Sequence, residues 1–131
     1  MNRILLAVAL CAGVAGCFAD ETVAGYGARD KAWLLDELDG APFSAKATLI
    51  FPNKGRIAGD APCNKYSATM EAPYPWFETG PILVTRRACP DLEAEGDFLR
   101  ALESMSQAEV LGSVLILSND AGREMVFKSD D

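Results

Sequence analysis

Short apolar runs, separated by turns that contain glycine or proline, make up most of this 131-residue chain. Runs this short are typical of β-strands, because a helix usually needs about ten residues or more. Connections this tight favour antiparallel neighbours. We predict strands or shorter extended pieces over residues 32–38, 46–51, 56–60, 64–70, 76–78, 81–85, 109–111, 113–117 and 125–128.

One segment shows the period of a helix instead. Its apolar side chains share a single face, formed by Phe98, Leu99, Leu102 and Met105. Asp91 is a candidate N-cap, and Glu93 and Glu95 suit the positive end of the helix dipole. We predict a helix from residue 92 to residue 104 or 105. Many strands and one helix predict a mainly β, α+β fold: an antiparallel, barrel-like sheet with the helix covering an opening or a face.

Two of the predicted strands carry further detail. Along residues 64–70 the side chains of Tyr66, Ala68 and Met70 alternate to one face, which is typical of a half-buried strand. Gly59 lies inside another short strand, where glycine indicates a bulge or the close approach of a second backbone.

The N-terminus has the composition of an export signal. Arg3 precedes an apolar run over residues 4–16, which is shorter than the roughly 20 residues that span a bilayer. The run ends in the sequence VAGC at residues 14–17, which resembles the bacterial lipobox. In that class of protein the cysteine receives a diacylglyceryl group and becomes the first residue after cleavage. Anchoring by two or more acyl chains is firm, whereas a single chain binds reversibly.

This resemblance implies a signal peptide over residues 1–16 and a lipid attached to Cys17, so that the membrane becomes a partner. Phe18 follows Cys17 where aspartate would imply retention at the inner membrane, which implies an outer-membrane lipoprotein facing the periplasm. The alternatives are a secretory signal cut after Ala19, giving a soluble periplasmic or secreted protein, and an uncleaved anchor. We expect residues 17–31 to form a flexible tether, which extended would reach about 50 Å, before a domain at 32–128.

The number and positions of the cysteines limit which disulfide, metal site or nucleophile the chain can form. Of the four in the chain, Cys11 lies in the signal and Cys17 would carry lipid, which leaves Cys63 and Cys89. In an oxidising compartment we expect these two to form a disulfide, with two free buried thiols as the alternative. On the chain-entropy model such a loop closure contributes about 3.5 kcal/mol. The chain has no histidine and no C-x-x-C pattern, so we predict no metal site, no cofactor and no cysteine nucleophile.

The balance of acidic and basic residues indicates which classes of macromolecule the chain could bind. Acidic residues outnumber basic ones by 19 to 12, the net charge is −7, and no stripe of lysine and arginine is present. Nucleic acid binding depends on neutralising phosphates with basic side chains. We therefore predict no nucleic acid partner and interpret the charge as a solvated surface.

Several short motifs, taken in order, resemble the META domain, also called the HslJ-like domain. They are WLL with LDG at residues 33–40, F with GRIAG at 51–59, CNKY at 63–66, GPI with TRRAC at 80–89, FLRAL at 98–102 and LIL at 115–117. Pro62 departs from the pattern, which commonly has glycine before this cysteine. The resemblance implies a β-barrel-like domain with one helix and no established enzyme activity. The family occurs in bacterial heat-shock and envelope lipoproteins, some linked to stress tolerance or drug resistance.

An aromatic cluster between prolines is a candidate contact for a partner. It comprises Tyr74, Trp76 and Phe77. Exposed, these rings would form a patch for a protein or ligand; buried, they would close one end of the barrel. We expect most of the cluster to be buried.

Other polar residues are expected to be structural. Asn64 is expected to bond the backbone of its own turn. Arg86 and Arg87 would point to opposite faces of a strand, one pairing with a carboxylate of the domain and the other solvated. The acidic group near the first turn is interpreted as surface charge, since no partner that could activate water is visible; it comprises Asp36, Glu37 and Asp39.

These observations predict a non-enzymatic, lipid-anchored protein of the cell envelope with a binding role or a role in stress and envelope integrity. One alternative is an inhibitor that holds a periplasmic protease or lysozyme through residues 74–77. Another is a carrier of a small apolar ligand in the barrel interior. An enzyme is the least expected class, because the chain contains no nucleophile-elbow, phosphate-loop, dinucleotide or metal signature.

Overall fold

The computed structural model describes residues 19–130. The predictions of a signal peptide, of lipid on Cys17 and of the fate of Cys11 lie outside the described residues. No helix of the described part is long and apolar enough to cross a bilayer.

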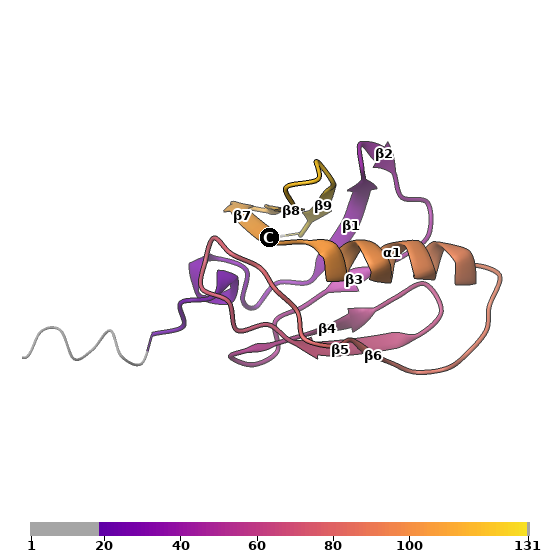
Figure 1. The fold of residues 1–131 in the computed structure, drawn as a ribbon, viewed down its shortest axis with the longest axis horizontal. Helices are drawn as coiled ribbons and strands as arrows, with labels where there is room; N and C mark the ends of the chain where they lie inside the picture. Colours follow the sequence, from indigo (N-terminus) through magenta and orange to yellow (C-terminus); the bar gives the residue numbers. More distant parts are fainter. Residues whose placement is uncertain (1–18, 131) are drawn as a thin grey trace, which may run out of the picture.

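The strands form two antiparallel sheets (Figure 1). The larger sheet has the order β2-β1-β9-β8-β7, with β3 also paired to β1. Its strands are β1 (Trp33–Leu38), β2 (Ala41–Pro42), β3 (Thr48–Leu49), β7 (Gln107–Leu111), β8 (Val114–Ser118) and β9 (Glu124–Lys128). The smaller sheet has the order β4-β5-β6. Its strands are β4 (Arg56–Asp60), β5 (Lys65–Thr69) and β6 (Leu83–Val84).

Single β-bridges connect the two sheets on both sides. Ile50, just beyond β3, bridges Ala58 of β4, and Trp76 bridges Gln107 at the start of β7. Thr79, a little further along, bridges Met70 at the end of β5. Across residues 19–130 these contacts bring the sheets round into a barrel-like form without one continuous ring of strands. The predicted mainly β, α+β class is confirmed.

Helix α1 (Leu92–Ser104) lies across the space between the sheets (Figure 1). Phe98 contacts both sides of that space: its ring centroid is 5.5 Å from that of Tyr66 on β5 and 6.4 Å from that of Phe43 beyond β2. The predicted helix and its apolar face are therefore confirmed. Asp91 occupies the N-cap position, but its side chain makes no capping hydrogen bond.

The interior is filled by aromatic and aliphatic side chains from both sheets and the helix. The largest fully buried ones are Trp33, Phe77, Phe98, Phe127, Leu49, Ile57, Met70, Leu102, Leu115, Leu117 and Met125. As predicted, Tyr66, Ala68 and Met70 all face this core. Close packing of this kind is that of an ordinary hydrophobic core, so it offers no support for a carrier of an apolar ligand in the interior.

Gly59 on β4 shows the close backbone approach that the sequence predicts. A Cβ at this position would overlap the backbone carbonyl oxygen of Thr48 on β3. The same oxygen accepts a 2.6 Å hydrogen bond from the Tyr66 hydroxyl. Glycine here therefore lets β3 and β4 approach closely at the junction of the two sheets.

The segment before β1 packs against the domain. It contains the short 3₁₀-helix η2 (Val23–Tyr26), and the side chains of Val23 and Ala28 are fully buried. The Ala28 carbonyl oxygen accepts a 2.9 Å hydrogen bond from the Trp33 indole. Residues 20–31 thus differ from the flexible tether that the sequence predicts over residues 17–31. Their small side chains follow no period, so tertiary contacts alone reveal their burial.

One predicted strand and one predicted extended piece are shorter than expected. Of residues 46–51 only Thr48–Leu49 form a strand, and of residues 76–78 only Trp76 pairs, in a single isolated bridge. Both segments lie at the junction of the two sheets, where the chain passes from one sheet to the other and pairs only briefly with each.

Candidate functional site

The disulfide brings the β4–β5 turn to the start of α1. Cys63 and Cys89 are joined in the structure, with Cα atoms 5.6 Å apart, a separation typical of disulfides. Cys63 lies just before β5 and Cys89 three residues before α1. The bond therefore closes one end of the domain, in the pairing that the sequence predicts.

A buried carboxylate reinforces this junction. Glu95 on α1 is buried and accepts 2.8 Å hydrogen bonds from the backbone N–H groups of Cys63 and Asn64. The side-chain Nδ2 of Asn64 donates a third, at 2.7 Å. The helix-dipole interpretation of Glu95 missed this role. The available signal is its spacing, because Glu95 shares the helix face of Phe98 and Leu102.

Asn64 connects these hydrogen bonds to the segment that follows β6. Its Oδ1 accepts hydrogen bonds from the Thr85 hydroxyl at 3.0 Å and from the Arg87 N–H at 2.6 Å. Its Nδ2 also donates to the Arg87 carbonyl oxygen at 2.9 Å. Asn64 is therefore structural, but it bonds the segment after β6 rather than its own turn.

A groove of about 680 Å³ runs between β6 and α1. Two large apolar side chains are exposed on it: Leu83 on β6 at 65% and Leu92 on α1 at 48%. The groove is lined by Asn64, Ile82, Leu83, Val84, Thr85, Arg86, Arg87, Ala88, Leu92, Glu95 and Leu99. We call it the β6 groove.

The charge in the β6 groove comes from Arg86, Arg87 and Glu95. Glu95 is already engaged by its three donors. Both arginines are exposed, and within residues 19–130 neither lies within 4.0 Å of a carboxylate, unlike the arginines at 29, 100 and 123. The expected pairing of one of them with a domain carboxylate is wrong. Two cations at the groove thus remain available to an anionic group.

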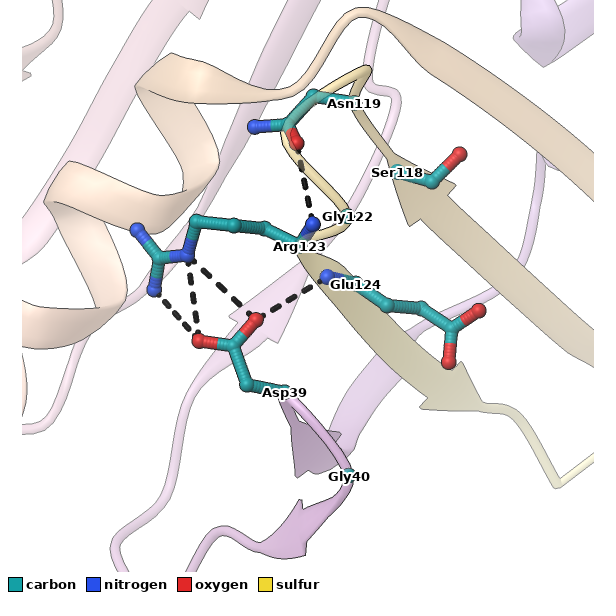
Figure 2. Close-up of a pocket in the computed structure, with 7 residues that line it drawn as sticks. All are labelled: Asp39, Gly40, Ser118, Asn119, Gly122, Arg123 and Glu124. Atoms are coloured by element: carbon teal, nitrogen blue, oxygen red, sulfur yellow. Dashed lines mark hydrogen bonds and ion pairs between the residues drawn. The ribbon is translucent and has the colours of Figure 1, made fainter.

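A second hollow, of about 490 Å³, lies where the β1–β2 turn meets the β8–β9 hairpin (Figure 2). Arg123 holds the Asp39 carboxylate through Nη2 at 2.8 Å and Nε at 3.2 Å, and the Glu124 N–H donates to it at 3.1 Å. The Arg123 side chain, followed by the Glu124 N–H, holds the pKa of Asp39 below its ordinary value of 3.8. The Glu124 carboxylate points away from Asp39 (Figure 2).

This hollow does not bring two free carboxylates together. Asp39 is bound by Arg123, and Asp36 lies 3.3 Å from the Lys128 ammonium group. A carboxylate held by a cation is a poor general base. In the described part of the chain no cluster of three metal-ligating side chains occurs either. These contacts agree with the interpretation of the acidic group as surface charge.

The aromatic cluster divides between core and surface. Phe77 is buried, and Tyr74 is half-buried with its ring stacked on Tyr26 at a centroid distance of 4.6 Å. Trp76 is 53% exposed, and Tyr26 is 55% exposed. Most of the cluster is thus part of the fold, as expected, and Trp76 alone of its three rings presents a large exposed surface.

The comparisons with known proteins agree with this fold. A family model described as the META domain matches residues 27–131. The chain belongs to the META domain family. The match begins inside the packed N-terminal segment, five residues before the boundary that the sequence predicts at residue 32. A search of curated protein sequences finds no match.

Solved structures share the META fold of this chain. One from Burkholderia xenovorans has 21% identity and a TM-score of 0.67, covering 96% of this chain and 94% of that chain. A DUF4847 family protein from Bacteroides vulgatus has 14% identity and a TM-score of 0.62, covering 88% and 96% respectively. At such identities the likeness concerns the fold alone, so the function of this META protein is argued from its surface.

Proposed function

We propose that this META protein is a non-enzymatic, lipid-anchored component of the bacterial cell envelope that binds an acidic, extended protein segment in the β6 groove. The observation that carries the proposal is the placement of Arg86 and Arg87, without carboxylate partners, beside two exposed leucines at a sheet edge. Each part of this arrangement matches a part of such a ligand.

The sheet edge suits an extended ligand. In the smaller sheet β6 pairs only with β5, through Val84 opposite Tyr66 and Leu83 opposite Ser67. Its second edge faces the groove toward α1. An exposed edge offers backbone hydrogen bonds to an added strand, while side-chain pockets select the sequence.

The side chains suit an acidic and partly apolar ligand. Leu83 and Leu92 offer apolar contact on either side of the groove, and the two arginines lie at the end of β6. Arginine binds carboxylates through two parallel hydrogen bonds. Since the whole chain carries a net charge of −7, attraction of an acidic segment must come from this local pair.

The alternative functions have less support. The segment suggested as an inhibitory loop is held along its backbone: the Tyr74 N–H donates to Glu21 at 2.6 Å and the Phe77 N–H to Ser106 at 3.0 Å. These bonds hold the segment against the N-terminal segment and the start of β7, and only Trp76 of its three aromatic rings presents a large exposed surface. Catalysis by Asp39 is disfavoured by its pairing with Arg123.

The groove proposal is tested with two short peptides of equal length, one alternating aspartate and leucine, the other alternating lysine and leucine. We expect the acidic peptide to shift the backbone amide NMR signals of Leu83, Val84 and Thr85, and the basic peptide to leave them unchanged. Charge reversal with Arg86→Glu and Arg87→Glu should abolish the shifts. Lys54→Glu, at an exposed lysine outside the groove, is the matched control. Equal binding of both peptides would refute the proposal.

The anchor is tested separately by fractionation and intact-mass analysis. We expect wild-type protein in the membrane fraction with the mass of a diacylglyceryl cysteine at its start. Cys17→Ala should move it to the soluble fraction, whereas Cys11→Ala, in the same leader, should have no effect. Membrane association that survives Cys17→Ala would exclude lipid on this residue as the anchor.

A further inference from the structure

We propose that the surface formed by Tyr26 and Trp76 lies in the headgroup region of the bilayer, so that the domain sits on the membrane instead of standing off it. The inference rests on the proposed lipidation of Cys17. It concerns a different surface from the β6 groove and a different occupant, the lipid interface itself.

Little chain is available between the proposed lipid and the folded domain. Asp20 is already fixed, because its carboxylate accepts hydrogen bonds from the Thr22 N–H and from Arg29, both at 2.9 Å. The next residue, Glu21, accepts a backbone hydrogen bond from Tyr74 at 2.6 Å. From Cys17 to Asp20 there are three residue steps, which span at most about 11 Å when extended.

This spacer is far shorter than the tether that the sequence predicts. A lipidated Cys17 lies at the bilayer surface, and the interfacial layer on each side of the hydrocarbon is itself roughly 5–8 Å thick. A reach of about 11 Å therefore leaves no room for a water-filled gap of any size. The end of the domain that carries Asp20 must face the membrane.

This end of the domain exposes two aromatic side chains. Tyr26 is 55% exposed and Trp76 is 53% exposed. Both adjoin Tyr74: Tyr26 stacks on its ring, and Trp76 follows it by two residues, where its N–H bonds the Pro73 carbonyl at 2.7 Å. Tyrosine and tryptophan favour the membrane–water interface, because their rings are apolar at one end and polar at the other.

The β6 groove opens at the other end of the domain. Figure 1 shows η2 and the connection from β6 to α1 at opposite ends of the long axis of the molecule. A membrane contact through Tyr26 would therefore point the Arg86–Arg87 end of the β6 groove away from the bilayer. In this orientation both proposed surfaces can be occupied together.

The charge around the surface formed by Tyr26 and Trp76 determines the lipid composition on which the contact should form. Across residues 20–31 the acidic Asp20, Glu21 and Asp30 outnumber the basic Arg29 and Lys31, and Arg29 is paired with Asp20. With no excess of positive charge there, anionic lipids add no attraction, so the contact should form on zwitterionic vesicles and persist at high salt, which screens exposed charges.

The test uses full-length lipidated protein reconstituted into phosphatidylcholine vesicles. The chain has two tryptophans, and Trp33 is fully buried, so changes in solvent access report on Trp76. On reconstitution we expect a shift of the emission to shorter wavelength, loss of quenching by acrylamide, and quenching by brominated phosphatidylcholine. Trp76→Phe supplies the Trp33 background and should show none of these changes.

A second variant tests the spacer. A long glycine–serine insertion between Phe18 and Ala19 should restore acrylamide quenching, because the effective concentration of membrane around Trp76 falls with linker length. Vesicle flotation separates the possible failures. Protein that floats while Trp76 stays as accessible as in solution overturns this inference and leaves the anchor intact. Protein that does not float overturns the anchor itself.

Discussion

The Glu95 carboxylate on α1 and the Asn64 side-chain amide beside β5 meet at 2.7 Å in the interior of the domain. The same two residues also bond three further groups: the Cys63 N–H, the Thr85 hydroxyl and the Arg87 N–H. A buried polar network in which every member is satisfied fixes one arrangement of its elements. This network holds the wall of the β6 groove against the start of α1.

Glu95→Ala should therefore destabilise the domain markedly. The substitution leaves two backbone N–H groups and the Asn64 amide without their acceptor in a buried site, which costs about 3 kcal/mol in total. Glu93→Ala is the matched control, because Glu93 lies two residues earlier in the first turn of the same helix and is exposed, and a change within about 0.5 kcal/mol is expected there. Urea unfolding measures both. Equal losses for the two variants would show that Glu95 contributes only through the helix dipole.

The disulfide should contribute a stability that reduction removes. Opening the Cys63–Cys89 loop costs about 3.5 kcal/mol on the chain-entropy model. The double variant Cys63→Ala, Cys89→Ala should lose a similar amount and become insensitive to reductant. Unfolding of the wild-type protein with and without reductant measures the difference, and intact mass after alkylation reports free thiols. Wild-type protein that takes up alkylating reagent without reduction would contradict the bond.

The Asp39–Arg123 pair should make stability depend on pH in the acid range. Because the pKa of folded Asp39 lies below 3.8, its ionised form stabilises the fold above that value. The contribution is lost as the pH falls through the pKa of the folded state. The pair is partly exposed, so the contribution is below about 1 kcal/mol. Asp39→Asn suits the test, since asparagine tolerates the positive φ of 53° at this position.

The free energy difference between wild type and Asp39→Asn should therefore be largest near neutral pH and shrink toward acid. Carboxyl NMR titration measures the pKa directly. Arg123→Gln should return the pKa of Asp39 toward its ordinary value, because the arginine hydrogen bonds are the largest cause of the shift. An Asp39 that titrates at its ordinary value in the wild-type protein would remove the basis for this pH dependence.

Local patterns predict the helix and most of the strands, but not β2 (Ala41–Pro42), which pairs for only two residues with the end of β1. The alternation of Tyr66, Ala68 and Met70 and the helical spacing of Phe98 and Leu102 each depend on neighbours in the sequence, and all five side chains are buried. The Cys63–Cys89 pairing could be predicted for another reason, because only two cysteines remain after the leader and the proposed lipid site are set aside.

The features that were missed depend on contacts distant in sequence. Val23 and Ala28 are buried by tertiary packing, and no local period marks them. Glu95 finds its donors more than thirty residues earlier, at Asn64, so its spacing alone could not distinguish a helix-dipole role from a buried acceptor. Trp76 and Phe77 are adjacent, yet one is exposed and the other buried, which depends on how the two sheets meet.

Two glycine substitutions should shift stability in opposite directions. Gly59→Ala places a Cβ against the rigid Thr48 backbone at the junction of β3 and β4, so the strands must separate, at a cost of about 2 kcal/mol. Gly96→Ala lies in α1, where the nearest contact is the movable end of the Arg100 side chain. There alanine should stabilise the helix by about 0.5–1 kcal/mol. Thermal and urea unfolding measure both variants. A Gly59→Ala protein as stable as wild type would show that β3 and β4 approach less closely than the structure places them.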